Sequence, residues 1–355
     1  MPLIIDAMNV RMGGAMILLN YLVKKIQQNN IDFKLLVNEE VYISDLIDDR
    51  KVIRVKIKNY FSRSSILKSH LKSSDDTLFC FANFPPSFKK KDLRVITFFH
   101  NYVLLPDYNL KNEPFKERLA QIIKRLYLKI FAKNSDIFVF QSTNVQKFFI
   151  DAYKVSERKC HIIPFFDEEK IICLKKDFDK DQSLKKVKNN FIFVGHPSVH
   201  KNQYTLLKAW EKLLEEGITP KLFLTIPNTQ VPHYVEFNKW VNELQSKGAH
   251  VYNLGDLKFE EVLKATYESE FCIYPSLIES FGLGLLEADY MDLKILASDL
   301  AYVHAIIEPS LTFDPNSIES IYNSVITALN SEIKKPKVLI KNQINDFISL
   351  LKQAI

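Results

Sequence analysis

Short apolar or aromatic runs alternate with longer helical patterns twice along this chain of 355 residues. The first series of runs comprises Leu3–Ala7, Phe33–Val37, Val52–Ile57, Thr77–Ala82, Val95–His100 and Ile137–Gln141. The second comprises Asn190–Gly195, Lys221–Ile226, Val251–Leu254, Phe271–Tyr274 and Lys294–Ser298. Strands that alternate with helices favour a parallel sheet with helices on both faces. The sequence therefore predicts an α/β protein with two Rossmann-like, doubly wound domains.

A charged stretch separates the two series, and the chain is longer than a single core usually supports. We predict an N-terminal domain over residues 1–166, a linker over 167–188 and a C-terminal domain over 189–337. A C-terminal helix over about 338–355 is expected to pack back on the N-terminal domain. Ligands of open α/β sheets bind beyond the carboxyl ends of the strands. We therefore expect the ligand in a cleft between two facing domains.

The sequence shows no membrane-spanning, secretory or metal-binding pattern. No apolar run approaches the roughly 18 residues that span a bilayer, and the first residues do not resemble a signal peptide. The 4 cysteines are scattered without a CxxC pair, which favours reduced thiols. We expect a cytoplasmic protein that needs neither metal nor cofactor. Peripheral attachment to the inner face of the cell membrane is an open extension of this expectation.

The most informative segment lies between a predicted strand and a predicted helix in the second half of the chain. Gly282 and Gly284 precede this helix in a chain with only 8 glycines. A helix N-terminus presents free N–H groups and a partial positive charge, which suit a phosphate. Glu279 stands before the glycines and Glu287 on the second helical turn. This order suits a ligand with hydroxyl groups at both ends and a diphosphate between them, as in a nucleotide sugar.

The run Glu279-Ser-Phe-Gly-Leu-Gly-Leu-Leu-Glu287 resembles the Glu-x7-Glu signature of glycosyltransferase family 4, whose members are retaining, nucleotide-sugar-dependent enzymes with the GT-B fold. The resemblance extends over about residues 191–329 and is weaker in the N-terminal half. It implies that Glu279 contacts the donor sugar and that Glu287 contacts the ribose. It also assigns donor binding to Ser280, Phe281, Gly282 and Leu283, with the diphosphate on the amides of the last three.

A second segment, Val194-Gly-His-Pro-Ser-Val-His-Lys201, follows the first strand of the second series. The family has an arginine after Val-Gly and a lysine five positions later. Lys201 matches the lysine, whereas His196 replaces the arginine. All arginines of this chain lie in its first half. The resemblance therefore assigns to Lys201 the diphosphate charge of the departing nucleotide. His196 and His200 are either helpers or surface residues.

Two segments of the first half match family elements less closely. Gly13 and Gly14 precede a helical pattern and correspond to a loop that approaches the donor diphosphate. His100 ends a strand-like run and corresponds to a histidine beside the donor sugar, while Asn101 replaces the family's aspartate. Taken alone, a glycine pair indicates an ordinary loop, and a lone histidine indicates a structural residue. The candidate catalytic residues are His100, Lys201 and Glu279.

The two halves of the chain carry opposite net charge. Residues 1–187 contain 33 Lys+Arg against 22 Asp+Glu, a net of +11, and the remainder contains 15 against 20, a net of −5. The helical pattern Pro114–Lys133 places apolar residues on one broad face between basic residues. Either this face packs on the sheet of the first domain, or the helix meets an anionic membrane surface. No nucleic-acid recognition motif is present, so we expect no nucleic-acid partner.

The resemblance implies transfer of a hexose-type sugar from a nucleoside-diphosphate sugar to a hydroxyl of a glycan or lipid-linked acceptor. We expect a role in bacterial surface polysaccharide biosynthesis, either lipopolysaccharide O-antigen or capsule. A nucleotide-sugar epimerase with the same fold and a non-catalytic nucleotide-sugar-binding relative remain open alternatives. The replacements at His196 and Asn101 keep the non-catalytic alternative open, whereas the intact Glu279, Glu287 and Lys201 favour an enzyme.

Overall fold

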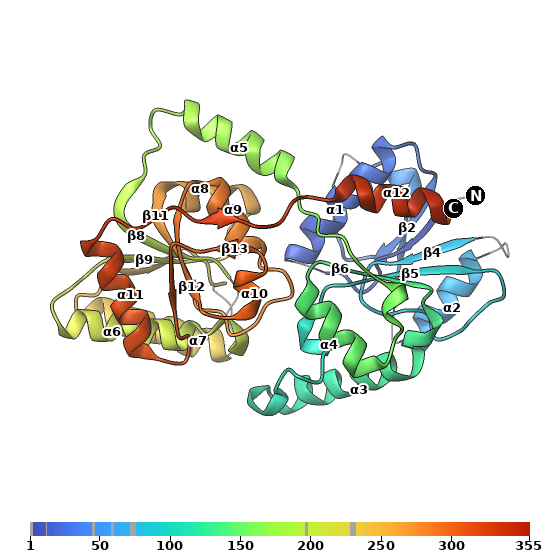
Figure 1. Cartoon of the computed structure of the whole chain (residues 1–355), viewed down its shortest axis with the longest axis horizontal. Coiled ribbons are helices and arrows are strands. Elements are labelled where there is room, and N and C mark those ends of the chain that lie inside the picture. Colours follow the sequence, from blue (N-terminus) through green and yellow to red (C-terminus); the bar gives the residue numbers. More distant parts are fainter. Residues whose placement is uncertain are drawn as a thin grey trace. The chain divides into compact units, whose positions relative to one another are not determined.

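The computed structural model describes residues 3–11, 13–44, 47–57, 60–71, 76–195, 198–227 and 232–355. The chain divides into an N-terminal unit, Met1–Asp167 with Lys341–Ile355, and a C-terminal unit, Glu168–Ile340. Each unit is a parallel sheet with helices on both of its faces (Figure 1). The predicted α/β class and the two Rossmann-like domains are therefore confirmed.

The N-terminal unit contains, among its described residues, a seven-stranded parallel sheet with the order β3-β2-β1-β4-β5-β6-β7. Its strands are β1 (Leu3–Asp6), β2 (Phe33–Asn38), β3 (Val52–Val55), β4 (Thr77–Cys80), β5 (Arg94–Phe99), β6 (Ile137–Phe140) and β7 (Cys160–Ile162). The helices before β7 are α1 (Gly14–Gln28), α2 (Tyr60–His70), α3 (Phe115–Phe131) and α4 (Thr143–Tyr153). The winding direction reverses between β1 and β4. Their carboxyl ends flank the switch point, where open α/β sheets bind ligands.

The last helix of the chain, α12 (Ile344–Ala354), belongs to the N-terminal unit and lies beside α1 (Figure 1). The ring of Phe347 packs against the rings of Phe79, Phe98 and Phe165 at centroid distances of 5.5, 6.3 and 5.3 Å. Thr77 Oγ1 also donates a hydrogen bond to the carbonyl oxygen of Ala354 (2.7 Å). Because truncating a buried phenylalanine costs about 3–5 kcal/mol, this helix is an integral part of the unit's core.

The C-terminal unit contains, within the described residues, a six-stranded parallel sheet with the order β10-β9-β8-β11-β12-β14 and an antiparallel pair, β13 and β15. The strands are β8 (Val187–Phe193), β9 (Lys221–Leu224), β10 (Val251–Asn253), β11 (Ser269–Tyr274), β12 (Lys294–Ser298), β13 (Ile307–Glu308), β14 (Leu311–Phe313) and β15 (Lys337–Val338). The helices are α5 (Glu168–Lys180), α6 (Gln203–Glu215), α7 (Pro232–Ser246), α8 (Phe259–Glu268), α9 (Leu283–Tyr290), α10 (Ala301–His304) and α11 (Ile318–Asn330). The winding direction reverses between β8 and β11, so the switch point lies between these central strands.

The charged stretch expected to form a linker is largely helical, because α5 covers Glu168–Lys180 and β8 begins at Val187. Its acidic first turn and basic last turn complement the helix dipole, and Ile171 is its buried anchor. The high charge of this stretch therefore reflects a solvated helical face and not an irregular connection.

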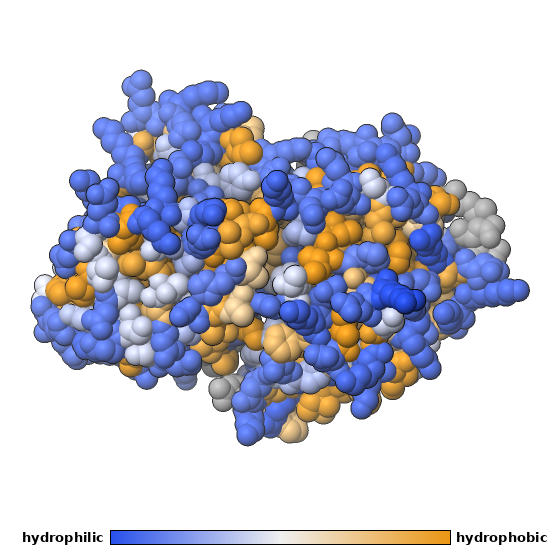
Figure 2. All heavy atoms as spheres, viewed as in Figure 1, coloured by the Kyte–Doolittle hydropathy of each residue, from blue (hydrophilic) through white to orange (hydrophobic). Residues whose placement is uncertain are grey.

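Helix α3 leaves the apolar face that was noted in the sequence open to solvent. Phe115, Leu119, Ile122, Ile123, Leu126 and Ile130 are all exposed, and only Tyr127 and Leu128 of the helix are buried. The interpretation that this face packs on the sheet is therefore wrong. Figure 2 shows apolar side chains among hydrophilic ones on the surface of the N-terminal unit where α3 runs. No helix among the described residues is long and apolar enough to cross a membrane.

Candidate functional site

The candidate site of the C-terminal unit lies at the switch point, where the loops after β8 and β11 are bonded to each other. Lys201 ends a single helical turn, η6 (Val199–Lys201), in the loop after β8. The next residue, Asn202, has a left-handed backbone with φ of 57°. Its side-chain amide donates to the carbonyl oxygens of Pro275 (3.2 Å) and Pro315 (2.7 Å). These bonds hold Lys201 against the loop that carries Glu279.

Lys201 and Glu279 form an ion pair, with 2.6 Å between Nζ and Oε1. Only 19% of the lysine side chain and 13% of the glutamate side chain are exposed, so water screens this attraction weakly. Burial raises the pKa of Glu279, but the Lys201 ammonium and the nearby His200 outweigh it, so the net pKa lies below the usual value. The Lys201 ammonium also lies 5.5 Å from the centre of the Tyr274 ring. Glu279 therefore stays ionised at neutral pH, and the pair is fixed in position.

The two glycines before and in α9 are required by their surroundings. Gly282 has a φ of +82°, and an added Cβ would lie 3.3 Å from Leu285 and 3.4 Å from Ile306. An added Cβ at Gly284 would lie 3.1 Å from Cε2 of Tyr274, so a larger residue would require the buried Tyr274 ring to shift. The N-cap residue Gly282 has no side chain with which to cap the helix, and the amide of Leu285 donates to the carbonyl oxygen of Gly282 (3.0 Å). A helix N-terminus without a side-chain cap is suited to bind an anion.

The other predicted residues of this loop surround the helix end. Phe281 is buried, and Ser280 and Leu283 are half-buried. Glu287, one turn further along α9, is largely enclosed, and burial raises its pKa to about 7 against the opposing charge of Lys201. A carboxyl whose charge is opposed by burial gains from a ligand that offers it hydroxyl donors. His196 lies outside the described residues, whereas His200 lies in η6.

In the N-terminal unit, His100 directly follows β5 and is held between aromatic rings. Its ring stacks on Phe98 with centroids 4.9 Å apart and contacts Phe81 at 5.3 Å. Burial lowers the pKa of His100 to about 4, so the imidazole is neutral at physiological pH. Its Nε2 atom is enclosed and has no hydrogen-bond partner among the described residues. Asn101 accepts a bond from Val103 N (3.1 Å), a capping role that asparagine and aspartate share.

The loop after β1 contains the predicted glycines and a residue that sequence reasoning missed. Gly13 has a φ of +72° and stands at the N-terminus of α1, and Gly14 begins that helix. Asn9, in the same loop, has an enclosed Nδ2 atom with no partner in the described part of the chain. A polar residue within an otherwise apolar segment was the available signal. At the start of this loop, the carboxylate of Asp6 accepts a 2.8 Å bond from Nε of Arg63, and both side chains are buried.

Residues 175–346, just under half of the chain, match the model of the family described as Glycosyl transferases group 1. The protein is a glycosyltransferase of the GT-B type. Its fold is similar to that of WaaG, a glycosyltransferase involved in lipopolysaccharide biosynthesis (TM-score 0.68, 15% identity, 93% of this chain and 90% of the other). A sucrose-phosphate synthase from Thermosynechococcus elongatus is also similar (TM-score 0.68, 14% identity, 92% and 89% coverage). Among the curated proteins, no match is found.

Anabaena HepE, whose structures contain UDP with glucose, or UDP-glucose, is another similar structure. The complex with UDP and glucose has a TM-score of 0.66 and 14% identity over 93% of this chain and 90% of the other. At this level of identity the likeness concerns the fold. The match to the glycosyltransferase model covers β8 to β14, which include Lys201, Glu279 and Glu287.

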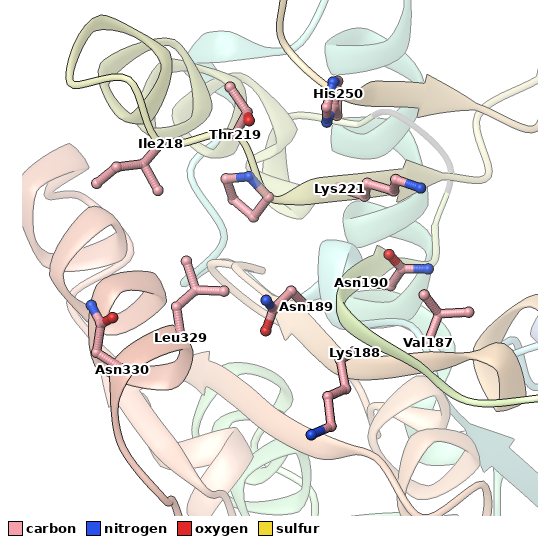
Figure 3. Close-up of a pocket in the computed structure, with 11 residues that line it drawn as sticks. Val187, Lys188, Asn189, Asn190, Ile218, Thr219, Lys221, His250, Leu329 and Asn330 are labelled. Carbon is pink, nitrogen blue, oxygen red and sulfur yellow. The ribbon is translucent and has the colours of Figure 1, made fainter.

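A cavity of this glycosyltransferase lies away from the candidate site. It has a volume of about 400 Å³ and is found at the amino ends of the central strands of the C-terminal unit (Figure 3). Lys188 of β8 and Lys221 of β9 line it, together with Ile218 and Leu329. No free helix N-terminus and no buried carboxylate line it, so we place the chemistry at the carboxyl edge. Among the described residues, no group of three or more His, Cys, Asp or Glu side chains could hold a metal ion.

Proposed function

We propose that this glycosyltransferase belongs to family 4 and transfers a hexose-type sugar, with retention of configuration, from a nucleoside-diphosphate sugar to a hydroxyl of a glycan or lipid-linked acceptor. The observation that carries the proposal is the enclosed Lys201–Glu279 pair at the uncapped N-terminus of α9, with Glu287 behind it. The UDP and UDP-glucose bound by HepE support a nucleotide-sugar donor of this kind.

The proposed role of Lys201 follows from the charge that develops during transfer. The bond between the sugar's anomeric carbon and the diphosphate oxygen breaks, and negative charge grows on the leaving diphosphate. The first amides of α9 and the Lys201 ammonium are preorganised donors for that charge. Gly282 permits the close approach of the phosphate, with Ser280, Phe281 and Leu283 forming the surrounding turn.

The two carboxylates take different ends of the donor. Glu279 is ionised by its pairing with Lys201 and accepts hydrogen bonds from hydroxyl groups of the donor sugar. Glu287 lies on the second turn of α9 and accepts hydrogen bonds from the two ribose hydroxyl groups. Among the described residues only Glu279 has a cation at hydrogen-bonding distance, so its pKa is lowered, whereas burial raises the pKa of Glu287.

In the N-terminal unit, His100 is assigned to the donor sugar and the glycine loop is assigned to the donor diphosphate. The neutral His100 ring offers an Nε2 atom that lacks a partner in the described part of the chain, and a sugar hydroxyl would satisfy it. Gly13 and Gly14 offer backbone amides at the start of α1. His196, in place of the family's arginine, is assigned as a helper of Lys201 in donor binding.

We place the reaction in bacterial surface polysaccharide biosynthesis, on lipopolysaccharide O-antigen or capsule, at the cytoplasmic face of the membrane. Two observations support this placement. The fold is similar to that of WaaG, which is involved in lipopolysaccharide biosynthesis, and residues 1–187 carry a net charge of +11. A basic unit is attracted to anionic lipid within about 8 Å at physiological salt. Transfer without a bound metal or cofactor is part of the same proposal.

Thermal-shift measurements with UDP-, GDP-, ADP- and dTDP-sugars test the donor assignment. A donor at 100 times its Kd adds about 2.7 kcal/mol of stability, and Glu287→Ala should remove that shift for the sugar nucleotide and for the free nucleotide. Product analysis with and without acceptor then separates transfer from epimerisation. The absence of a shift with every donor, or an unchanged shift in Glu287→Ala, would contradict the assignment.

A further inference from the structure

Helix α3 exposes its apolar residues and turns a more polar side toward the protein. The exposed fractions are large for Phe115 (70%), Leu119 (48%), Ile122 (50%), Ile123 (51%), Leu126 (56%) and Ile130 (47%). Residues 115, 119, 122, 126 and 130 follow the three- and four-residue spacing that aligns side chains along one face of a helix. We call these six residues the α3 stripe. A helix of a water-soluble domain normally turns such a face to the core.

The inner side of α3 is bonded firmly to the rest of its unit. Nη2 of Arg125 donates to the carbonyl oxygens of Val103 (2.9 Å) and Tyr108 (2.8 Å). The hydroxyl of Tyr127 donates to the carbonyl oxygen of Pro85 (2.9 Å). The orientation of the helix is therefore fixed by buried contacts, and the α3 stripe faces outward as a consequence of them.

Basic side chains border the α3 stripe. Lys116, Lys129 and Lys133 are exposed, and Arg118 is half-buried. None of these four cations pairs with a carboxylate within the described part of the chain. Long basic side chains can reach lipid phosphates while the apolar residues between them enter the acyl region. An apolar stripe with basic borders is the chemistry that an anionic bilayer surface complements.

We propose that α3 lies in the plane of a bilayer with anionic headgroups and inserts the α3 stripe at the boundary between headgroups and acyl chains. A helix of 17 residues is about 26 Å long at 1.5 Å per residue. An interfacial helix of this kind buries its apolar face about 5–10 Å deep. The helix does not cross the bilayer, because charged residues border it on both sides.

A second copy of the chain complements the α3 stripe less well than an anionic bilayer does. In a twofold dimer the same patch meets itself. The basic borders of the two stripes would then face each other, and like charges in contact are unfavourable. Anionic headgroups neutralise these borders, so lipid satisfies both the apolar and the charged parts of the surface.

The position of α3 links the bilayer to the candidate site of the same unit. The backbone groups held by Arg125, at Val103 and Tyr108, belong to the loop that follows His100. A lipid-carried acceptor on the docked surface would thus lie on the side of the unit that carries His100. This last step rests on the proposed function. The binding of α3 to lipid does not.

Vesicle flotation tests the proposal with the full-length protein and the double variant Ile122→Ser/Leu126→Ser. The matched control is Ile172→Ser/Leu339→Ser, which removes the same residue types from exposed positions (37% and 45%) of the C-terminal unit. We use phosphatidylglycerol–phosphatidylethanolamine vesicles at low and high salt and pure phosphatidylcholine vesicles. The wild type and the control should keep binding anionic vesicles at 0.5 M salt, where charge attraction is screened to about 4 Å. The salt-resistant partitioning of the α3 variant should be at least tenfold lower than that of the wild type.

A depth probe and a size measurement complete the test. Phe115→Trp should be quenched by lipids brominated in the acyl chain, beyond the quenching of the wild-type tryptophans. Equal salt-resistant binding of the α3 variant and the wild type would overturn the proposal. So would a wild-type dimer in solution that the α3 variant converts to a monomer. Because donor binding is measured without vesicles, loss of donor shifts would overturn the proposed function and leave the lipid result standing.

Discussion

The two units share one architecture and use a buried ion pair in different ways. In the C-terminal unit, Lys201 and Glu279 are partly accessible and stand at the uncapped end of α9. In the N-terminal unit, Arg63 and Asp6 are almost completely buried (1% and 0% exposed), and Arg63 also donates to the carbonyl oxygens of Phe84 and Pro85. The first pair is available to a ligand, whereas the second has its hydrogen bonds satisfied internally.

The units also differ in the charge of their candidate site residues. The C-terminal unit presents an ionised pair and a helix end, which suit a charged diphosphate. The N-terminal unit presents the neutral ring of His100 and the amide of Asn9, each with an enclosed atom that has no partner among the described residues. Neutral groups of this kind suit sugar hydroxyls. The comparison teaches that similar sheets acquire different chemistry from the loops at their switch points.

The largest expected effect concerns the structural pair of the N-terminal unit. Arg63→Leu should destabilise the protein by about 3–5 kcal/mol, because it leaves the Asp6 carboxylate buried without a cation. Urea unfolding measures the change. The control Arg54→Leu breaks an exposed pair with Asp49 and should cost less than about 1 kcal/mol. Similar small losses in both variants would show that the Arg63–Asp6 pair is not structural.

Removal of the cation from the C-terminal pair should affect the reaction more than the fold. Lys201→Ala should lower the transfer rate about 100- to 1,000-fold, the usual effect of losing a stabiliser of developing negative charge. Steady-state kinetics with the donor found by thermal shift measures it. Lys212→Ala, which breaks the surface pair with Glu319, should leave the rate unchanged. A rate for Lys201→Ala within threefold of wild type would place the phosphate site elsewhere.

Glu287 should make the ligand-free C-terminal unit less stable at high pH. Its folded pKa of about 7 exceeds the usual value of 4.5, so the stability falls as pH rises from about 4.5 to 7 and levels off above that. Glu287→Gln should therefore add about 2–3 kcal/mol at pH 8.5 and almost nothing at pH 4. Urea unfolding at the two pH values checks this, while the affinity for free nucleotide should fall. Equal gains in the free energy of unfolding at both pH values would show that the buried charge of Glu287 is not the cause.

His100 should give the N-terminal unit the opposite pH dependence. Its folded pKa of about 4 is below the usual value of 6.5, so the unfolded chain takes up the proton first and stability falls as pH drops below 6.5. His100→Phe keeps an aromatic ring between Phe81 and Phe98 and should add about 2 kcal/mol at pH 4.5 but little at pH 8. The measurement is chemical unfolding at both values, and a gain only at high pH would be inconsistent with a buried neutral imidazole.

The smallest expected effect tests the charge difference between the units. Lys89 and Lys91 are exposed, whereas Lys90 donates to the carbonyl oxygen of Leu71. Lys89→Glu/Lys91→Glu should weaken binding to anionic vesicles at least about 30-fold at low salt, since each of the two basic residues near the surface contributes about 1 kcal/mol. Transfer to a soluble acceptor analogue should not change. Lys180→Glu/Lys185→Glu, in the C-terminal unit, serves as the control, and equal weakening in both variants would remove the distinction between the units.

Much of the fold could be read from the sequence because its signals are local. The alternation of short β-branched runs with helical patterns depends on neighbouring residues, and it predicted both sheets and most of their strands. The three-residue strands β7 and β14 were missed, whereas β10, which is equally short, was predicted from the run Val251–Leu254. Runs this short carry too little periodicity to be found reliably. The Glu279–Glu287 segment was also found locally, since its glycines and carboxylates are separated by few residues.

The sequence by itself determined the α/β class, the strand–turn–helix order around Gly282 and the opposite charges of the two halves. Tertiary structure alone decided which side chains meet across the chain: Lys201 with Glu279, 78 residues apart, and Arg63 with Asp6, 57 apart. It also decided the orientation of α3, whose pattern fits either a core or a membrane. Helical periodicity specifies that a face is apolar, but the partner of that face depends on contacts distant in sequence, such as those of Arg125 and Tyr127 that turn the α3 stripe outward.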